Sequence, residues 1–231
     1  MDEGPAASAE SAYHPLARTF AFEGLLGFAH RLDDGPDGKT VQKGNGLQLG
    51  AGLFFAPSRL VALGVRYIYS DLGLEKEGSA QTQGASANVY RRLHTVQGGF
   101  RLYPYEKGRF RAWAGLFVGA SFEDSWAVGA RVTQQYPVTA DSYRVTLDSQ
   151  VTVSGNAGLG VDYDATKNTG VFAGLNFSKH FFSSDPQTTD DPDINVSGIG
   201  PAMQLDFRLG VQYRFDLTGS HKDQSSQTAR R

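Results

Sequence analysis

The amino-acid sequence predicts an all-β fold, a transmembrane up-and-down antiparallel β-barrel of eight strands. Apolar and polar residues alternate with period two along eight segments, which indicates strands whose two faces meet different surroundings. The connections between these segments are alternately short and long. Aromatic residues collect at both ends of the segments, as they do at the two interfaces of a membrane.

The last segment, Met203–Phe215, shows the alternation without an exception. A helix over the same residues would scatter the charges around its whole circumference, so the pattern favours a strand. The apolar residues of this segment are Met203, Leu205, Phe207, Leu209, Val211, Tyr213 and Phe215, and the residues between them are Gln204, Asp206, Arg208, Gly210, Gln212 and Arg214.

Seven earlier segments repeat the pattern with some exceptions. An apolar band about 25 Å tall, crossed at a tilt of roughly 40°, needs about ten residues per strand, which these segments supply. In chain order they are Thr19–Leu32, Gly46–Phe55, Leu60–Ser70, Tyr90–Tyr103, Phe110–Phe122, Val151–Tyr163 and Gly170–Phe182.

The connections alternate strictly in length. The short ones contain Pro, Gly, Asn or Asp, which suit tight turns: Ala56–Arg59, Pro104–Gly108 and Asp164–Thr169. The long ones are Asp33–Asn45, Asp71–Asn88, Glu123–Gln150 and Ser183–Pro201. In transmembrane barrels short turns face the periplasm and long loops face outward, so both termini are expected in the periplasm.

The longest connection contains β-forming residues of its own. Ala127–Gln135 and Asp141–Gln150 are expected to continue the fifth and sixth strands as a hairpin above the membrane. The alternative is that residues 127–150 add two membrane strands and make a barrel of ten.

Aromatic side chains at the ends of the segments are expected to form two interfacial girdles. Beside the short turns lie Phe20, Phe55, Tyr103, Phe110, Tyr163 and Phe215, and beside the long loops lie Tyr67, Tyr69, Phe122 and Trp126. Aromatic residues that cap an ordinary β-core are the alternative interpretation.

Composition agrees with a barrel in a bacterial outer membrane. The 231 residues include 28 Gly and 12% aromatic residues, no Cys, and a net charge of −2 that gives no reason to expect nucleic acid. No apolar run approaches the roughly 18 residues of a membrane helix. Met1–Glu10 lacks the apolar centre of a secretory signal, so the full-length gene product is expected to carry a signal upstream of Asp2.

The alternating final strand, which ends in LGVQYRF at Phe215, and the order of turns and loops resemble the eight-stranded OmpA-type outer-membrane barrels. The resemblance covers roughly Thr19–Leu217 and concerns pattern, so it implies fold and location more than activity. It divides the chain into a periplasmic N-terminal extension (1–18), the barrel (19–217) and a polar C-terminal tail or linker (218–231).

Charged residues on the polar faces of the strands form the candidate functional site. An eight-stranded barrel is just wide enough to be filled by its own side chains, so buried charges must be paired. A paired network that fills the lumen is one interpretation, and a narrow pore that favours anions is the other. Gly50, Gly52, Ser154, Gly158 and Gly160 would leave room for water in such a pore. The predicted network is Glu23, Arg66, Arg101, Arg111, Asp162, Asp206, Arg208 and Arg214.

The sequence predicts no catalytic, cofactor-binding or metal-binding residues. His30, His94 and His180 fall near the outer rim, but none is in a His-x-Ser arrangement of the kind used by barrel deacylases. The acidic loops Asp33–Gly38 and Asp185–Asp193 lack the spacing of a full calcium loop, and solvated turns explain them better.

The sequence therefore favours a non-enzymatic outer-membrane barrel that acts as an envelope scaffold or as part of an envelope assembly. Its expected partners are outer-membrane lipid and other envelope proteins, which its long outer loops would contact, and no small-molecule substrate is identified. A small anion-leaning channel or diffusion pore is the alternative. A soluble lipocalin-like ligand-binding barrel is the third, because alternation alone does not say which face points inward.

Overall fold

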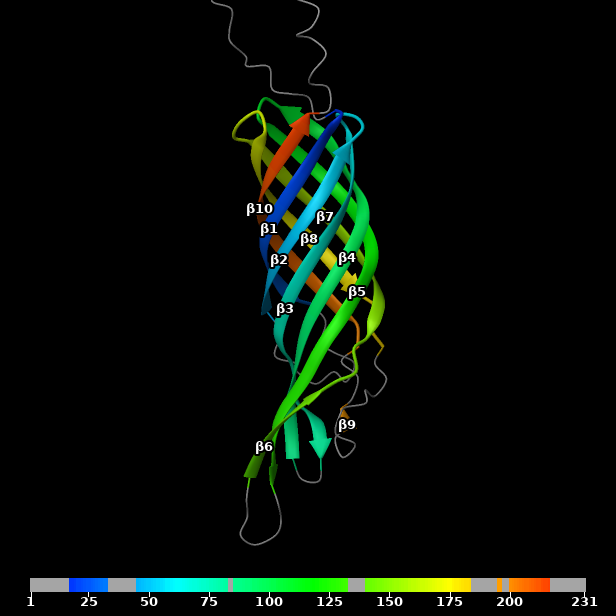
Figure 1. Ribbon diagram of the computed structural model, residues 1–231, viewed down its shortest axis with the longest axis vertical. Coiled ribbons are helices and arrows are strands. Elements are labelled where there is room, and N and C mark those ends of the chain that lie inside the picture. The colour runs from blue at the N-terminus through cyan, green and yellow to red at the C-terminus, as the bar shows by residue number, and fades with distance from the viewer. Residues whose placement is uncertain are drawn as a thin grey trace, which may run out of the picture.

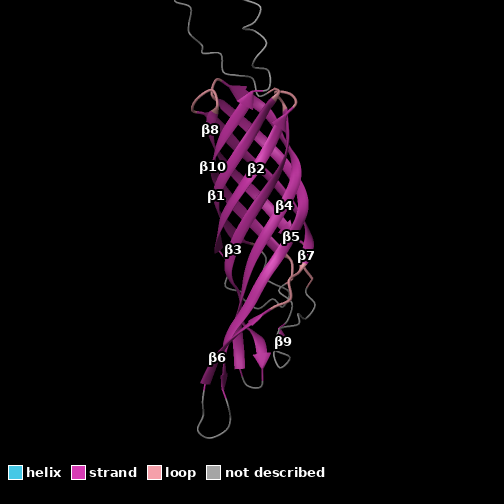
Figure 2. Cartoon of the chain, in the orientation of Figure 1, coloured by secondary structure: helices cyan, strands magenta, loops and turns pink. Residues whose placement is uncertain are grey.

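The computed structural model describes residues 17–32, 45–82, 85–132, 140–183, 195–196 and 200–216. Every element in these ranges is a β-strand (Figure 2). Among the described residues, no helix is long and apolar enough to cross a bilayer. The terminal extensions and the acidic loops Asp33–Gly38 and Asp185–Asp193 lie outside the described residues.

The strands pair only in antiparallel fashion. Their bounds are β1 (Thr19–Arg31), β2 (Asn45–Ala56), β3 (Val61–Thr82), β4 (Ala85–Lys107), β5 (Phe110–Val132), β6 (Ala140–Thr146), β7 (Val151–Asp164), β8 (Thr169–His180), β9 (Asn195–Val196) and β10 (Ala202–Asp216).

Eight of these strands close into a barrel, as the sequence predicts (Figure 1). The order β2-β1-β10-β8-β7-β5-β4-β3 ends where β3 pairs with β2, so the barrel has no free edge. β1, the first strand of the chain, pairs with β10, the last barrel strand, and so closes the barrel. The pairing covers thirteen residue pairs, from Thr19↔Asp216 to Arg31↔Gln204. The ten-strand alternative is wrong, because β6 pairs with β5 only beyond the barrel wall.

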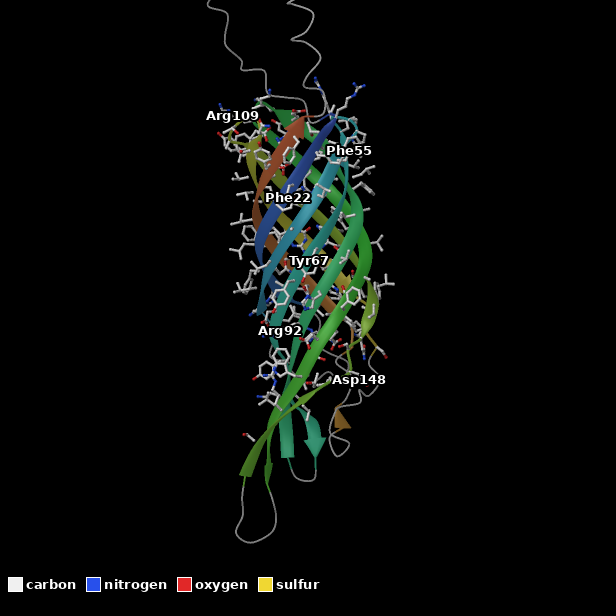
Figure 3. All side chains as sticks on the ribbon, in the orientation of Figure 1. Phe22, Phe55, Tyr67, Arg92, Arg109 and Asp148 are labelled. Carbon is white, nitrogen blue, oxygen red and sulfur yellow. The ribbon has the colours of Figure 1, made fainter. Side chains whose placement is uncertain are left out.

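The barrel is apolar outside and polar inside. Leu47, Val118 and Val151 are 63–64% exposed, whereas Gln204 and Asp206 are completely buried. In Figure 3, Phe22, Phe55 and Tyr67 project away from the wall. Alternation sets this arrangement, because successive side chains of a strand point to opposite faces. The lipocalin-like alternative is therefore wrong, since it requires the apolar face to point inward.

Two of the predicted long loops consist largely of strand. β3 and β4 continue their pairing from Asp71↔Arg92 to Thr82↔Ala85, with three register shifts. β5 runs on to Val132 and pairs with β6, which confirms the predicted hairpin above the barrel. Figure 1 shows both hairpins extending beyond one end of the barrel. The prediction of a loop over Asp71–Asn88 was wrong. A hairpin in water can have two polar faces, so its strands stay paired beyond the point where apolar and polar residues stop alternating.

Aromatic rings pair at the short-turn end of the outer surface. The centroids of Phe20 and Phe55 are 5.0 Å apart, and those of Phe110 and Tyr163 are 4.8 Å apart. Phe215 packs 4.8 Å from Tyr213 on the same strand. Neighbouring interfacial rings of this kind stabilise each other at the boundary between lipid and water.

The opposite end of the outer surface carries a second aromatic group. The Tyr67 hydroxyl is 2.7 Å from Nδ1 of His94, and the Tyr69 ring lies 5.2 Å from the same imidazole. Phe122 is 44% exposed beside them in the sheet. Trp126 lies four residues beyond Phe122, where β5 has left β7 and pairs with β6.

Tyr103 corrects the girdle prediction. Its side chain is only 5% exposed and points into the lumen, where its hydroxyl donates a hydrogen bond to Asp162. Alternation with the outward residues Phe100 and Leu102 requires this direction. The outward aromatic at this end of β4 is Tyr105, because a register shift follows Leu102.

Candidate functional site

The barrel lumen holds all eight of the charges that the sequence places there, and none of them is more than 7% exposed. At the short-turn end, Asp164 accepts hydrogen bonds from Arg111, at 2.5 Å, and from Arg214. Arg214 also lies 3.9 Å from Asp162. Two arginines thus share two carboxylates, an arrangement that compensates the loss of solvation on burial.

A second layer is centred on Arg101. Its guanidinium donates two hydrogen bonds to Glu23, at 2.5 and 2.8 Å, in the bidentate geometry that Arg and carboxylate favour. Glu23 is on β1 and Arg101 is on β4, so this pair crosses the lumen between strands that are not neighbours. The guanidinium also stacks on Phe54 at 4.2 Å and on Trp113 at 4.5 Å.

Large aromatic side chains fill the space around this pair. Phe54, Trp113 and Phe117 are each 3% exposed, and Phe172 is 5% exposed. Phe54 and Phe117 meet edge to face with centroids 6.0 Å apart. Sequence reasoning missed Phe54, Trp113 and Phe117, although alternation with Ala112 and Ala114 places Trp113 inside.

Inward glycines receive the aromatic rings. A Cβ atom at Gly160 would lie 2.5 Å from Cζ2 of Trp113, and one at Gly210 would lie 2.3 Å from Cζ of Phe172. These distances are too short for any side chain larger than hydrogen. The expectation that lumen glycines leave room for water is therefore wrong at Gly160, where the indole ring occupies that room.

Arg66 belongs to a layer in which amides replace carboxylates. Its Nε and Nη2 donate to Oε1 of Gln97 at 3.1 and 2.8 Å, and its guanidinium stacks 3.7 Å above the Phe117 ring. Gln97 in turn donates to the hydroxyl of Ser154 at 3.1 Å. Among the described residues, Arg66 forms no ion pair, so this layer holds a positive charge on neutral acceptors.

Asp206 is the centre of the next layer. It accepts hydrogen bonds from Arg208 at 2.7 Å, from Gln48 at 3.0 Å and from the Ser178 hydroxyl at 2.5 Å. Arg208 donates back to Oε1 of Gln48 at 3.1 Å, so these side chains form a closed network. Strands β2, β8 and β10 contribute to it, which ties three parts of the wall together.

At the end near the long hairpins, an ion pair and an apolar cluster close the lumen. Arg91 lies 3.3 Å from Glu123 and donates to the Gly200 carbonyl at 3.0 Å, and both charged side chains are completely buried. The cluster beside them consists of Ala29, Leu72, Leu93 and Phe182. Sequence reasoning missed both residues, because Arg91 lies at the start of the segment Tyr90–Tyr103, where alternation is weak, and Glu123 lies just beyond the segment Phe110–Phe122.

The described interior has more positive than negative groups. Its buried arginines are Arg31, Arg66, Arg91, Arg101, Arg111, Arg208 and Arg214, and its buried carboxylates are Glu23, Glu123, Asp162, Asp164 and Asp206. Seven cations thus face five anions, and an anion would meet a lower electrostatic barrier than a cation on entering.

One serine and one histidine meet in the lumen. The Ser121 hydroxyl is 2.7 Å from Nδ1 of His180 and 2.9 Å from the Thr95 hydroxyl. Such a contact is the first requirement of a serine nucleophile, and sequence spacing could not reveal it because β5 and β8 are separated by β7. Ser121 is completely buried, which keeps substrates from its hydroxyl. Within the described residues, no three His, Asp or Glu side chains gather as metal ligands do.

A closed barrel with an apolar exterior and a charged, hydrogen-bonded interior is a transmembrane β-barrel, because its strands satisfy each other's backbone groups and its outer surface suits lipid. The predicted resemblance to eight-stranded OmpA-type barrels is confirmed as a likeness of fold.

Solved structures of outer-membrane barrels align with most of the chain. Neisserial surface protein A is 11% identical, with 85% of this chain and 97% of that chain covered and a TM-score of 0.49. A major outer membrane protein of Thermus thermophilus is 14% identical (84% and 99% covered, TM-score 0.49). OprG of Pseudomonas aeruginosa is also 14% identical (87% and 97% covered, TM-score 0.47). No protein-family model and no curated protein sequence matches the chain.

Proposed function

We propose that this protein is a non-conducting, non-enzymatic barrel of the bacterial outer membrane that presents its long hairpins to other envelope proteins. The observation that carries the proposal is the filled lumen. The Glu23–Arg101 pair, stacked on Phe54 and Trp113, crosses the lumen, and the Arg91–Glu123 pair lies beside an apolar cluster at one end.

The hairpins supply the contact surface. Tyr90 and Trp126 stack with centroids 5.6 Å apart, and Arg92 and Arg144 lie over the Trp126 ring at 4.6 and 5.0 Å. Aromatic and Arg side chains are the residues most enriched at protein interfaces. Rigid pairing with β6 holds this group beyond the barrel, where a partner can reach it.

A narrow anion-leaning channel is the second candidate, and the excess of buried arginine favours it. Planar bilayer recordings separate the two functions. The scaffold predicts no steady conductance from the purified protein, and it predicts conductance only after the filling is removed in the double variant Phe54→Ala/Trp113→Ala. A steady wild-type current that falls in Arg66→Ala would instead assign a channel.

The partner contact is tested by co-purification from native membranes in mild detergent. The double variant Trp126→Ala/Arg144→Ala removes two side chains of this group, whereas β5 and β6 still pair through their backbones. We expect envelope proteins to co-purify with the wild type and to be lost from this variant. Equal recovery from both proteins would remove the group around Trp126 from the proposal.

The non-enzymatic part has its own test. A fluorophosphonate probe labels activated serines, and complete burial of Ser121 predicts no labelling of the folded barrel. Labelling that disappears in Ser121→Ala would contradict the proposal, and Ser58 in an exposed turn is the matched control.

A further inference from the structure

The outer surface carries one charged side chain among its apolar residues on β8. A single rung of paired residues crosses four strands from Gly98 through Val118 and Gly155 to Lys179. All four point outward, because their neighbours along each strand point into the lumen. Gly98 and Gly155 therefore leave two gaps in the lipid-facing wall, and Lys179 stands at one end of the row.

These gaps form a groove of about 410 Å³. A Cβ atom built on Gly155 would meet nothing within 4 Å, so the floor of the groove is open toward lipid. Leu116, Phe177 and Phe181 form its apolar sides. Three interstrand steps separate Gly98 from Lys179, so the groove is about 14 Å long. This length and volume fit a single acyl chain.

Lys179 lies among apolar neighbours. Phe177 is the outward residue before it on β8, Phe181 follows just beyond the end of that strand, and the Lys179 ammonium is 5.0 Å from the Phe181 ring. Val151 and Val153, at 64% and 60% exposed, extend the apolar surface of β7 further toward the long hairpins. Among the described residues Lys179 forms no ion pair, although a cation in an apolar band needs an anionic partner.

We propose that this groove binds one anionic phospholipid, with an acyl chain over Gly155 and Gly98 and the phosphate on the Lys179 ammonium. The groove has room for one acyl chain, and the single ammonium beside it can bind one phosphate. The proposal rests on the transmembrane fold and is independent of the scaffold function. A second apolar groove, of about 760 Å³ between Gly24, Val171 and Val211, has no charged residue in its wall and serves as the internal control.

The test is native mass spectrometry of the full chain in detergent, with phosphatidylglycerol and phosphatidylcholine of identical chains. We expect the wild type to prefer phosphatidylglycerol about fivefold, which corresponds to one Lys near a phosphate. Lys179→Gln should remove the preference and Lys179→Arg should keep it. Gly155→Leu should reduce binding of both lipids, whereas Gly24→Leu in the control groove should leave the preference unchanged.

Two results would overturn the proposal. A phosphatidylglycerol preference that survives Lys179→Gln would show that this ammonium does not hold the phosphate. Equal binding by Gly155→Leu and wild type, in protein whose heat-modifiable gel mobility shows a folded barrel, would show that the groove holds no acyl chain. Displacement of phosphatidylglycerol by an equal concentration of lipid A would assign the site to a glycolipid and not to a phospholipid.

Discussion

The inner and outer faces of the barrel are made by alternate residues of the same strands, yet they tolerate change very differently. On β10, Leu209 and Val211 meet lipid through non-directional contacts, whereas Asp206 and Arg208, which precede them on the same strand, hold hydrogen bonds with defined partners. The specificity of this fold therefore lies in the lumen, where each buried charge requires its own partner.

Breaking the Glu23–Arg101 ion pair should have the largest effect. Arg101→Leu leaves the Glu23 carboxylate buried without its bidentate donor, and we expect a loss of about 3–5 kcal/mol in the free energy of unfolding. Guanidinium unfolding in lipid vesicles measures it. The control is Arg109→Leu in an exposed turn (labelled in Figure 3), which should change stability by less than about 0.5 kcal/mol.

The double variant Glu23→Gln/Arg101→Leu sharpens this prediction. It removes both charges, so much of the lost stability should return. A double variant no more stable than Arg101→Leu would show that the stacking of Arg101 on Phe54 and Trp113 matters more than its charge.

A charge on the outer face tests the other side of the comparison. Leu209→Arg exposes a guanidinium to lipid, and we expect a loss of about 2–4 kcal/mol if the residue lies near the bilayer midplane. Vesicle unfolding again measures it, with Ala165→Arg in an exposed short turn as the control. Equal stabilities for the two variants would contradict the transmembrane assignment of β10.

Alternation made the fold and the direction of most side chains predictable from sequence. The order of short and long connections gave the strand count, and the lumen position of Arg208 follows from Leu209 beside it. Alternation could not give the partners. Glu23 meets Arg101 across 78 positions of chain, and only the closed circle of strands brings them together.

The structural predictions from sequence were wrong where the alternation of apolar and polar residues gives no guide. The sequence of residues 71–88 predicts a loop, although β3 and β4 continue there, because above the membrane neither face of a hairpin needs to be apolar. The position of Tyr103 at a strand end predicts a girdle residue, but the alternation along its strand turns the side chain inward. The sequence does not reveal that Phe54 and Trp113 fill the lumen. Inward glycines on neighbouring strands suggest empty space, and only the structure shows that these rings occupy it.

Substitutions of two glycines on opposite faces of the wall should have effects of intermediate size on stability. Gly210→Ala forces a Cβ atom to within 2.3 Å of Phe172 and 2.4 Å of the Gly24 carbonyl, and we expect a loss of about 1–3 kcal/mol. Gly155→Ala faces open space and should stay within about 0.5 kcal/mol of wild type. The same vesicle unfolding assay compares the two, and the reverse order would place Gly155, not Gly210, on the packed face.

The smallest effect is expected at the outer aromatic group. Tyr67→Phe removes the hydroxyl that lies 2.7 Å from Nδ1 of His94, at a site where Tyr67 is 42% exposed. Water or lipid headgroups can replace a partner there, so the loss should not exceed about 1 kcal/mol. A double-mutant cycle with His94→Leu isolates the pair, and a coupling well above this value would mean that the outer end of the barrel excludes water as the lumen does, which would erase the distinction between the two faces at this level.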